Sequence, residues 1–178
     1  MSINWTMIAP DGRTPVPLPR EKIFFKQSST NFELDCSGSK STTLTPPSSP
    51  AFFPSGAWHD ANGTVFLSNQ RVIYLPDRPS QQLQSFHVPL LSLKSCKYEQ
   101  PWFAANYISG HVLPVAGGGL SQPGQLKLIF KEGGGFEFYS IFRELLERID
   151  ETNEVPQHLE ALPTYTASGS VAPGEMPP

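Results

Sequence analysis

Between residues 20 and 135, apolar and polar positions alternate in short runs that are separated by Gly, Pro, Ser and Asn. This is the pattern of β-strands joined by turns. The clearest hairpin is GTVFLSNQRVIYLPD, in which Ser68-Asn69-Gln70 forms the turn. Together the runs predict about seven strands. The other runs are KIFF, NFELDCS, LQSFHVPLLSL, KSCKYEQ, NYISGHVLPV, QLKLIF and FEFY.

The period changes near the end of this region. From Phe138 onward the apolar positions follow the spacing of one helix face, and charged residues occupy the opposite side. Such a stripe is suited to close the open end of a curled sheet. The predicted fold class is therefore mainly β (α+β), a barrel of about seven strands closed by one C-terminal amphipathic helix. The stripe consists of Phe138, Ile141, Phe142, Leu145, Leu146 and Ile149.

Proline divides the chain into parts. The chain has 19 prolines among 178 residues, and they crowd near both ends and into one internal segment. Nearly all large apolar side chains lie between residues 20 and 150, enough for one core. We predict an extended arm at 1–20, a folded domain at 21–152 with a Ser/Thr/Pro-rich inserted loop at 38–56, and a disordered proline-rich tail at 153–178.

The pattern of reactive side chains does not indicate catalysis. Cys36 and Cys96 stand apart, and the four histidines are scattered singly without a nucleophile elbow or a metal-binding motif. Two triple-glycine runs lack the Gly-Lys-Ser/Thr of a phosphate loop, and we interpret both as hairpin turns between strands. We expect a non-enzymatic protein without a metal, a cofactor or a small-molecule substrate.

Charge and hydropathy set the expected location. The net charge of −3 provides no general attraction to nucleic acid or anionic lipid. The N-terminal residues do not resemble a signal peptide, and no run approaches about 18 apolar residues. We expect the protein in the cytoplasm and the nucleus.

The stretch QPWFAANYISG, residues 100–110, raises the question of a binding surface. We interpret it as a corner between two strands, in which Pro101 interrupts the ladder and Phe103 and Tyr107 point into or along the barrel. Large aromatic side chains usually fill cores, which favours this interpretation. A binding surface is the alternative.

Four ordered blocks, GTVFLSNQRVIYL, QSFHVPL, QPWFAANYISGHV and KLIFKEGGGFEF, resemble the GRAM domain of the WW domain-binding protein 2 family. The resemblance covers about residues 20–150 and implies a PH-like fold. It departs from the family pattern at Ala104, which stands in the place of a glycine. It also implies partners with WW domains, namely HECT-type ubiquitin ligases and transcriptional regulators, together with a coactivator role and chromatin association through those partners.

The tail carries the candidate for such an interaction. Leu162, Pro163 and Tyr165 form an LPxY motif, a variant of the PPxY ligand of WW domains. Proline presets an extended polyproline II backbone, so that little entropy is lost on docking. Animal members of the family carry several PPxY copies in long tails, whereas this tail has a single LPxY.

The alternative function is binding to a phosphoinositide at a membrane surface. Arg20, Lys22 and Lys26 could face an anionic headgroup from the first strands, although Glu21 lies among them. Because each basic residue near a membrane contributes only about 1 kcal/mol, we interpret these residues as a solvated surface with weak or no lipid binding.

Overall fold

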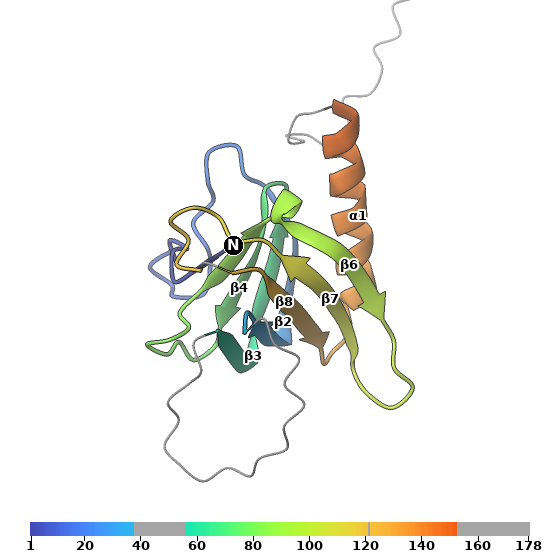
Figure 1. The fold of residues 1–178 in the computed structure, drawn as a ribbon, viewed down its shortest axis with the longest axis horizontal. Coiled ribbons are helices and arrows are strands. Elements are labelled where there is room, and N and C mark those ends of the chain that lie inside the picture. Colours follow the sequence, from blue (N-terminus) through green and yellow to red (C-terminus); the bar gives the residue numbers. More distant parts are fainter. Residues whose placement is uncertain (38–55, 121, 153–178) are drawn as a thin grey trace, which may run out of the picture.

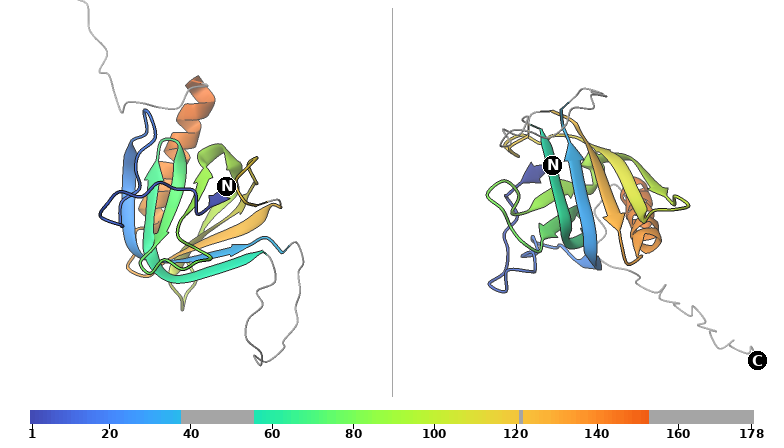
Figure 2. Two further views of the ribbon diagram at one scale, coloured as in Figure 1. Left: turned by 90° about the vertical axis from the view of Figure 1, so that its left-hand side faces the viewer. Right: turned by 90° about the horizontal axis from the view of Figure 1, so that it is seen from below.

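The computed structural model describes residues 1–37, 56–120 and 122–152. Within them, eight antiparallel strands form one curled sheet in the order β1-β5-β4-β3-β2-β8-β7-β6 (Figure 1). A single described helix, α1, lies across the open side of the curl (Figures 1 and 2). The elements are β1 (Ser2–Ile3), β2 (Ile23–Asp35), β3 (Ala57–Ser68), β4 (Arg71–Pro76), β5 (Phe86–Pro89), a 3-10 turn (Leu90–Ser92), β6 (Leu93–Glu99), β7 (Asn106–Val112), β8 (Gly124–Phe130) and α1 (Gly135–Thr152).

Strand β2 is one long bent strand, which corrects the prediction of two short strands around a turn. Its residues 30–35 pair with both β3 and β8, whereas residues 23–27 pair with β3 only. Register shifts between Gln27 and Thr30, with Ser29 at a φ of 54°, bend the strand without ending it. A bulge of this kind increases the local twist. The first half of β2 therefore leaves β8, and the barrel opens there.

Helix α1 fills this opening, as the apolar stripe predicts. Phe138, Phe142, Leu145 and Ile149 are buried, while Ile141 and Leu146 are half-buried. The ring of Phe138 lies 5.6 Å from that of Phe25 on β2 and 5.8 Å from that of Phe130 on β8. One helical side chain thus joins the two strands that diverge at the opening.

The helix begins earlier than the sequence pattern suggested. FEFY was expected as a strand, yet residues 136–139 are the first turn of α1, so that prediction is wrong. Gly133 and Gly134, with φ of 88° and 86°, end β8, and the Gly134 carbonyl accepts the N–H of Phe138. The run Gly133-Gly134-Gly135 therefore joins a strand to a helix and is not a hairpin turn. The alternation of Phe136 and Phe138 resembles a strand because residues two apart on a helix also lie on roughly opposite faces. Here Phe138 is buried and Phe136 is exposed.

The first 22 residues lie against the sheet. β1 pairs with β5, and Ile8 packs on a small cluster formed by Phe66, Ile73 and Leu75 outside the main core. Figure 2 shows this segment running along the outer surface of the sheet. Residues 1–20, set apart in the sequence as an arm, are thus in contact with the domain.

The segment 100–105 is the corner between β6 and β7, but its aromatic side chains do not enter the barrel. Trp102 is 96% exposed and Phe103 is 102% exposed, so the expected inward position of Phe103 is wrong. The loop extends beyond the last paired residues, Glu99 and Tyr107, where no core lies beneath it. The Nζ atom of Lys127 lies over the ring of Tyr107, 4.4 Å from the ring centroid.

Two predicted segments fall outside the described residues. They are the inserted loop at 38–56, apart from Gly56 at its end, and the tail at 153–178.

The closing role of α1 can be tested with Leu145→Ala. Leu145 is 4% exposed, and truncating a buried leucine costs about 2–5 kcal/mol of the free energy of unfolding. Urea unfolding followed by circular dichroism measures the loss. Glu147→Ala, on the exposed face of the same helix, is the matched control. A loss for Leu145→Ala no larger than that of the control would contradict the assignment.

Candidate functional site

The predicted WW-binding residues, Leu162, Pro163 and Tyr165, lie outside the described residues. The chain reaches them after α1 ends at Thr152. The described geometry is therefore that of the domain preceding the motif, together with the candidate lipid-binding cations.

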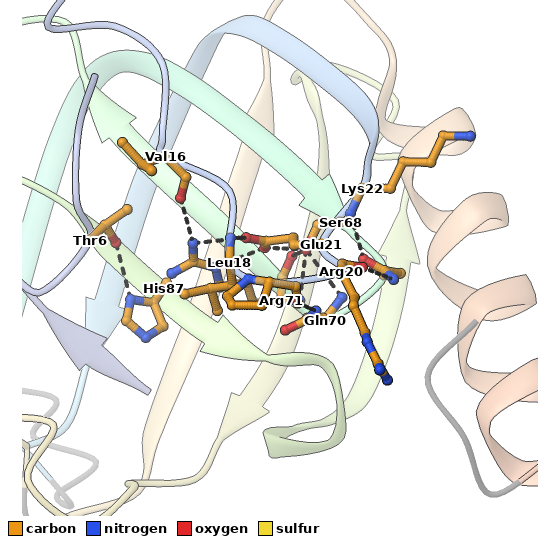
Figure 3. Close-up of polar contacts among 12 residues, drawn as sticks. Thr6, Val16, Leu18, Arg20, Glu21, Lys22, Ser68, Gln70, Arg71 and His87 are labelled. Carbon is orange, nitrogen blue, oxygen red and sulfur yellow. Dashed lines mark hydrogen bonds and ion pairs between the residues drawn. The ribbon is translucent and has the colours of Figure 1, made fainter. Parts of the chain in front are cut away.

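The three candidate cations do not converge on one position. The Lys22 Nζ atom lies 5.7 Å from the ring centroid of Phe24, and the Lys26 Nζ atom lies 5.5 Å from that of Phe66. The side chains of Arg20 and Lys22 point away from each other (Figure 3). Each lysine thus lies over a different aromatic ring.

Glu21, which lies between these cations in the sequence, points inward and forms a buried ion pair. Its carboxylate accepts two hydrogen bonds from Arg71, at 2.8 Å from Nε and 3.0 Å from Nη2 (Figure 3). The Ser68 hydroxyl and the Leu18 N–H donate to the same carboxylate. The Glu21 and Arg71 side chains are 0% and 6% exposed. This bidentate pair fastens the end of the N-terminal segment to β4.

The surroundings of Glu21 keep it ionised. Burial alone raises the pKa of Glu21, but the hydrogen bonds from Arg71, Ser68 and Leu18 outweigh it and hold the pKa below its usual value. Arg71 also donates to the carbonyl oxygen of Val16. The ion pair thus ties two points of the N-terminal segment to a strand of the core.

The turn between β3 and β4 supports this attachment and confirms the predicted hairpin. Asn69 Oδ1 accepts the N–H of Lys22 at 2.8 Å, and Asn69 Nδ2 donates to the Arg20 carbonyl at 3.1 Å. Gln70 Nε2 donates to the Pro19 carbonyl at 2.9 Å. The turn side chains therefore hold residues 19–22, and the backbone of Arg20 adopts a φ of 62°.

From the sequence alone, Glu21 was interpreted only as a charge that weakens the basic cluster. The sequence feature that points to a buried ion pair is Arg71, a charged residue at the start of the apolar run RVIYL. A cation at the start of a buried strand requires an anionic partner. The sequence did not identify that partner because 50 residues separate the two.

His87, which is half-buried, forms a second polar contact with the N-terminal segment. The Ser2 hydroxyl lies 2.8 Å from Nε2 and the Thr6 hydroxyl lies 3.0 Å from Nδ1. Burial, and then the positive charge of Arg71, lower the pKa of His87 to about 4. The ring is therefore neutral near pH 7 and joins β5 to the N-terminal segment through hydroxyl groups.

A surface cavity of about 400 Å³ lies where residues 12–13 approach β2, β3 and β4. Arg13 and Lys26 bring positive charge to its lining and Asp77 brings negative charge. Asp11 lies close enough for Lys26 to contribute to lowering its pKa, after the larger effects of hydrogen bonds from Thr14 and Arg13. The cavity therefore has no excess of positive charge that would select an anionic headgroup.

Both cysteines are free thiols, Cys36 buried and Cys96 half-buried. Burial raises the pKa of Cys36 to about 11 and that of Cys96 to about 12, so both are protonated near pH 7. In residues 1–37, 56–120 and 122–152, no group of three His, Cys, Asp or Glu side chains is placed to hold a metal ion. The described helix is too polar to cross a membrane.

Comparison with known proteins identifies relatives. The chain is 32% identical over 169 residues to the UPF0664 stress-induced protein of Schizosaccharomyces pombe, covering 93% of this chain and 88% of that protein. It is 45% identical over 76 residues to WW domain-binding protein 2 of Homo sapiens, covering 43% of this chain and 29% of the human protein. With the protein of the same name from Mus musculus, identity is 37% over 108 residues, which cover 40% of the mouse protein.

The fold also has a solved counterpart. The Vps36 N-terminal PH domain superposes on 85% of this chain with a TM-score of 0.53 and 18% sequence identity, and the match covers 95% of that domain. This confirms the PH-like fold class. A search of protein-family models gave no match. The aligned segments span less than half of the mammalian WW domain-binding proteins.

The buried ion pair can be tested with Arg71→Met. Because this change leaves the Glu21 carboxylate buried and unpaired, we expect a loss of about 3–5 kcal/mol in the free energy of unfolding. The double variant Glu21→Met/Arg71→Met should be more stable than Arg71→Met, since no buried charge remains. Urea unfolding of the double variant and of the single variants Glu21→Met and Arg71→Met measures the difference. A double variant as unstable as the sum of both single changes would argue against the pair.

His87 should make stability depend on pH. Above pH 6.5 His87 is neutral in both the folded and the unfolded state; between pH 6.5 and about 4 the unfolded state binds a proton that the folded state does not. Stability is therefore lost as the pH falls through this range. In His87→Gln, the difference in unfolding free energy between neutral and acidic pH should shrink. His111→Gln, at an exposed position, is the matched control, and equal pH dependence in His87→Gln and wild type would contradict the prediction.

Proposed function

The chain belongs to the family of the UPF0664 stress-induced protein of Schizosaccharomyces pombe, and part of it is similar to WW domain-binding protein 2. On this basis we propose that it is a non-enzymatic adaptor whose tail recruits a WW-domain protein through Leu162, Pro163 and Tyr165. The observation that carries this proposal is the sequence LPTY in a chain related to proteins named for WW-domain binding. The PH-like domain supplies a rigid body from which the tail extends beyond Thr152.

The chemistry of the motif fits a WW domain. Pro163 presets the polyproline II backbone, and its ring inserts between the aromatic walls of the WW groove. Tyr165 occupies a separate pocket two residues further on. Because the tail has one such motif, repeated contacts cannot raise the affinity, and the partner must supply further contacts or tolerate a short-lived complex.

The partner classes follow from the family resemblance. They are HECT-type ubiquitin ligases and transcriptional regulators with WW domains. With the first class the protein acts as a ubiquitin-ligase adaptor, and with the second as a transcription coactivator that reaches chromatin through its partner. Both roles place the protein in the cytoplasm and the nucleus.

A scaffold role agrees with the chemistry of the domain. The polar side chains of Glu21, Arg71 and His87 are engaged in holding the N-terminal segment, and the thiols of Cys36 and Cys96 are protonated near pH 7. These groups stabilise the fold and leave the recruitment of partners to surface features and the tail.

The motif can be tested with Tyr165→Ala. Removing the ring empties the tyrosine pocket of the WW domain, so the variant should lose capture by immobilised WW domains while its melting temperature stays at the wild-type value. Thr164→Ala is the matched control, because the third position of LPxY is not fixed by the motif. Capture is compared for the three full-length chains against a panel of WW domains from HECT ligases and transcriptional regulators.

Two results would refute the proposed site. In one, Tyr165→Ala is captured as strongly as wild type. In the other, no WW domain of the panel retains the wild-type chain.

A further inference from the structure

Two adjacent aromatic side chains stand free at the end of the β6–β7 hairpin. Trp102 and Phe103 are 96% and 102% exposed, so neither packs against its own fold. Residues 100–105, which we name the hairpin tip, project beyond the sheet (Figure 1). Adjacent large apolar side chains left uncovered on a soluble domain usually mark an interaction site.

Aromatic side chains also connect the base of the hairpin to the start of α1. Phe136 is 66% exposed, and its ring lies 6.0 Å from that of Tyr98, on the strand that leads into the tip. Tyr98 also stacks on Tyr139 at 6.2 Å, and its hydroxyl accepts a hydrogen bond from Gln100. These contacts anchor the base of the hairpin to the helix and thereby fix the direction in which the tip projects.

The hairpin tip carries no charge. Its sequence is QPWFAA, and the nearest acidic residue, Glu99, accepts hydrogen bonds from Tyr107 and Ser109. Among the neighbouring charged residues, Lys97 and Lys127 lie close enough to Glu99 to lower its pKa, after the larger effects of these hydrogen bonds. The tip itself is therefore uncharged, while one carboxylate and two lysines lie near its base.

We propose that the hairpin tip inserts Trp102 and Phe103 into the interfacial layer of a lipid bilayer. Both side chains are fully exposed beyond the last strand pair, and the tip lacks the charged groups that fix register in a protein pocket. Trp is enriched at the level of lipid headgroups, where an amphipathic ring is half in water and half in hydrocarbon. An uncharged tip needs no particular headgroup.

This mode of membrane binding differs from the phosphoinositide alternative. Arg20 and Lys22 lie near the β3–β4 turn, whereas the tip lies at the far end of the β6–β7 hairpin. Binding through the tip depends on apolar area and is insensitive to salt, while binding through the cations depends on anionic lipid and is screened by salt. The proposal is also independent of the tail motif.

Flotation of the full-length chain with phosphatidylcholine vesicles tests the proposal. Wild type should float, with little change when phosphatidylserine or salt is added. Trp102→Ser/Phe103→Ser should lower the vesicle partition coefficient by at least about tenfold. Because both side chains are fully exposed, the melting temperature should not fall. The matched control is Trp5→Ser/Met7→Ser, a pair 67% and 69% exposed beside β5.

A second measurement reports on Trp102 directly. The chain has three tryptophans, so Trp5→Phe/Trp58→Phe leaves Trp102 as the single emitter. Its fluorescence should shift to shorter wavelength on adding phosphatidylcholine vesicles and should be quenched by brominated lipid. Tyr165→Ala should float like wild type, which separates this proposal from the WW-binding proposal.

Several outcomes would overturn the proposal. They are absence of wild-type flotation, equal flotation of the tip double variant, and flotation that requires a phosphoinositide and is lost in Lys22→Glu/Lys26→Glu. Loss of a protein partner by the tip variant, without any vesicle binding by wild type, would assign the tip to a protein pocket instead.

Discussion

The burial of one helix face in the open side of the sheet is the constraint on which the other features depend. The bend in β2 separates its first half from β8, and Phe138 fills the gap by contacting Phe25 and Phe130. The same helix supports the aromatic base of the hairpin tip through Tyr98 and Phe136. Its last residue, Thr152, fixes the point from which the tail departs. The packing of one helix thus positions both the base of the hairpin and the C-terminal end of the described chain.

The N-terminal segment is held by a different kind of interaction. Its contacts with the domain centre on buried polar groups, above all the Glu21–Arg71 pair and the hydroxyl contacts of His87. Removing charges from water is costly, and here bidentate geometry and added donors offset that cost. Such contacts favour one arrangement of the segment, because any other arrangement would leave a buried charged group, such as Arg71, without its partner.

The sequence predicted what depends on local periodicity. It indicated the change of period at Phe138, the hairpin at Ser68–Gln70 and a curled sheet closed by one helix. It did not indicate the bulge at Ser29, because polar residues favour a turn and a bulge equally. The side chain of Phe103 was predicted to point inward because the sequence does not show where the hairpin extends beyond the core. Glu21 was missed because its partner is distant in sequence, and the LPxY residues lie outside the described structure.

Helix α1 also acts as a spacer. Its 18 residues rise about 27 Å, from the aromatic base of the hairpin to the origin of the tail. The base of the hairpin and the exit of the chain from α1, which we propose to serve different partners, are therefore held apart by one rigid helix length.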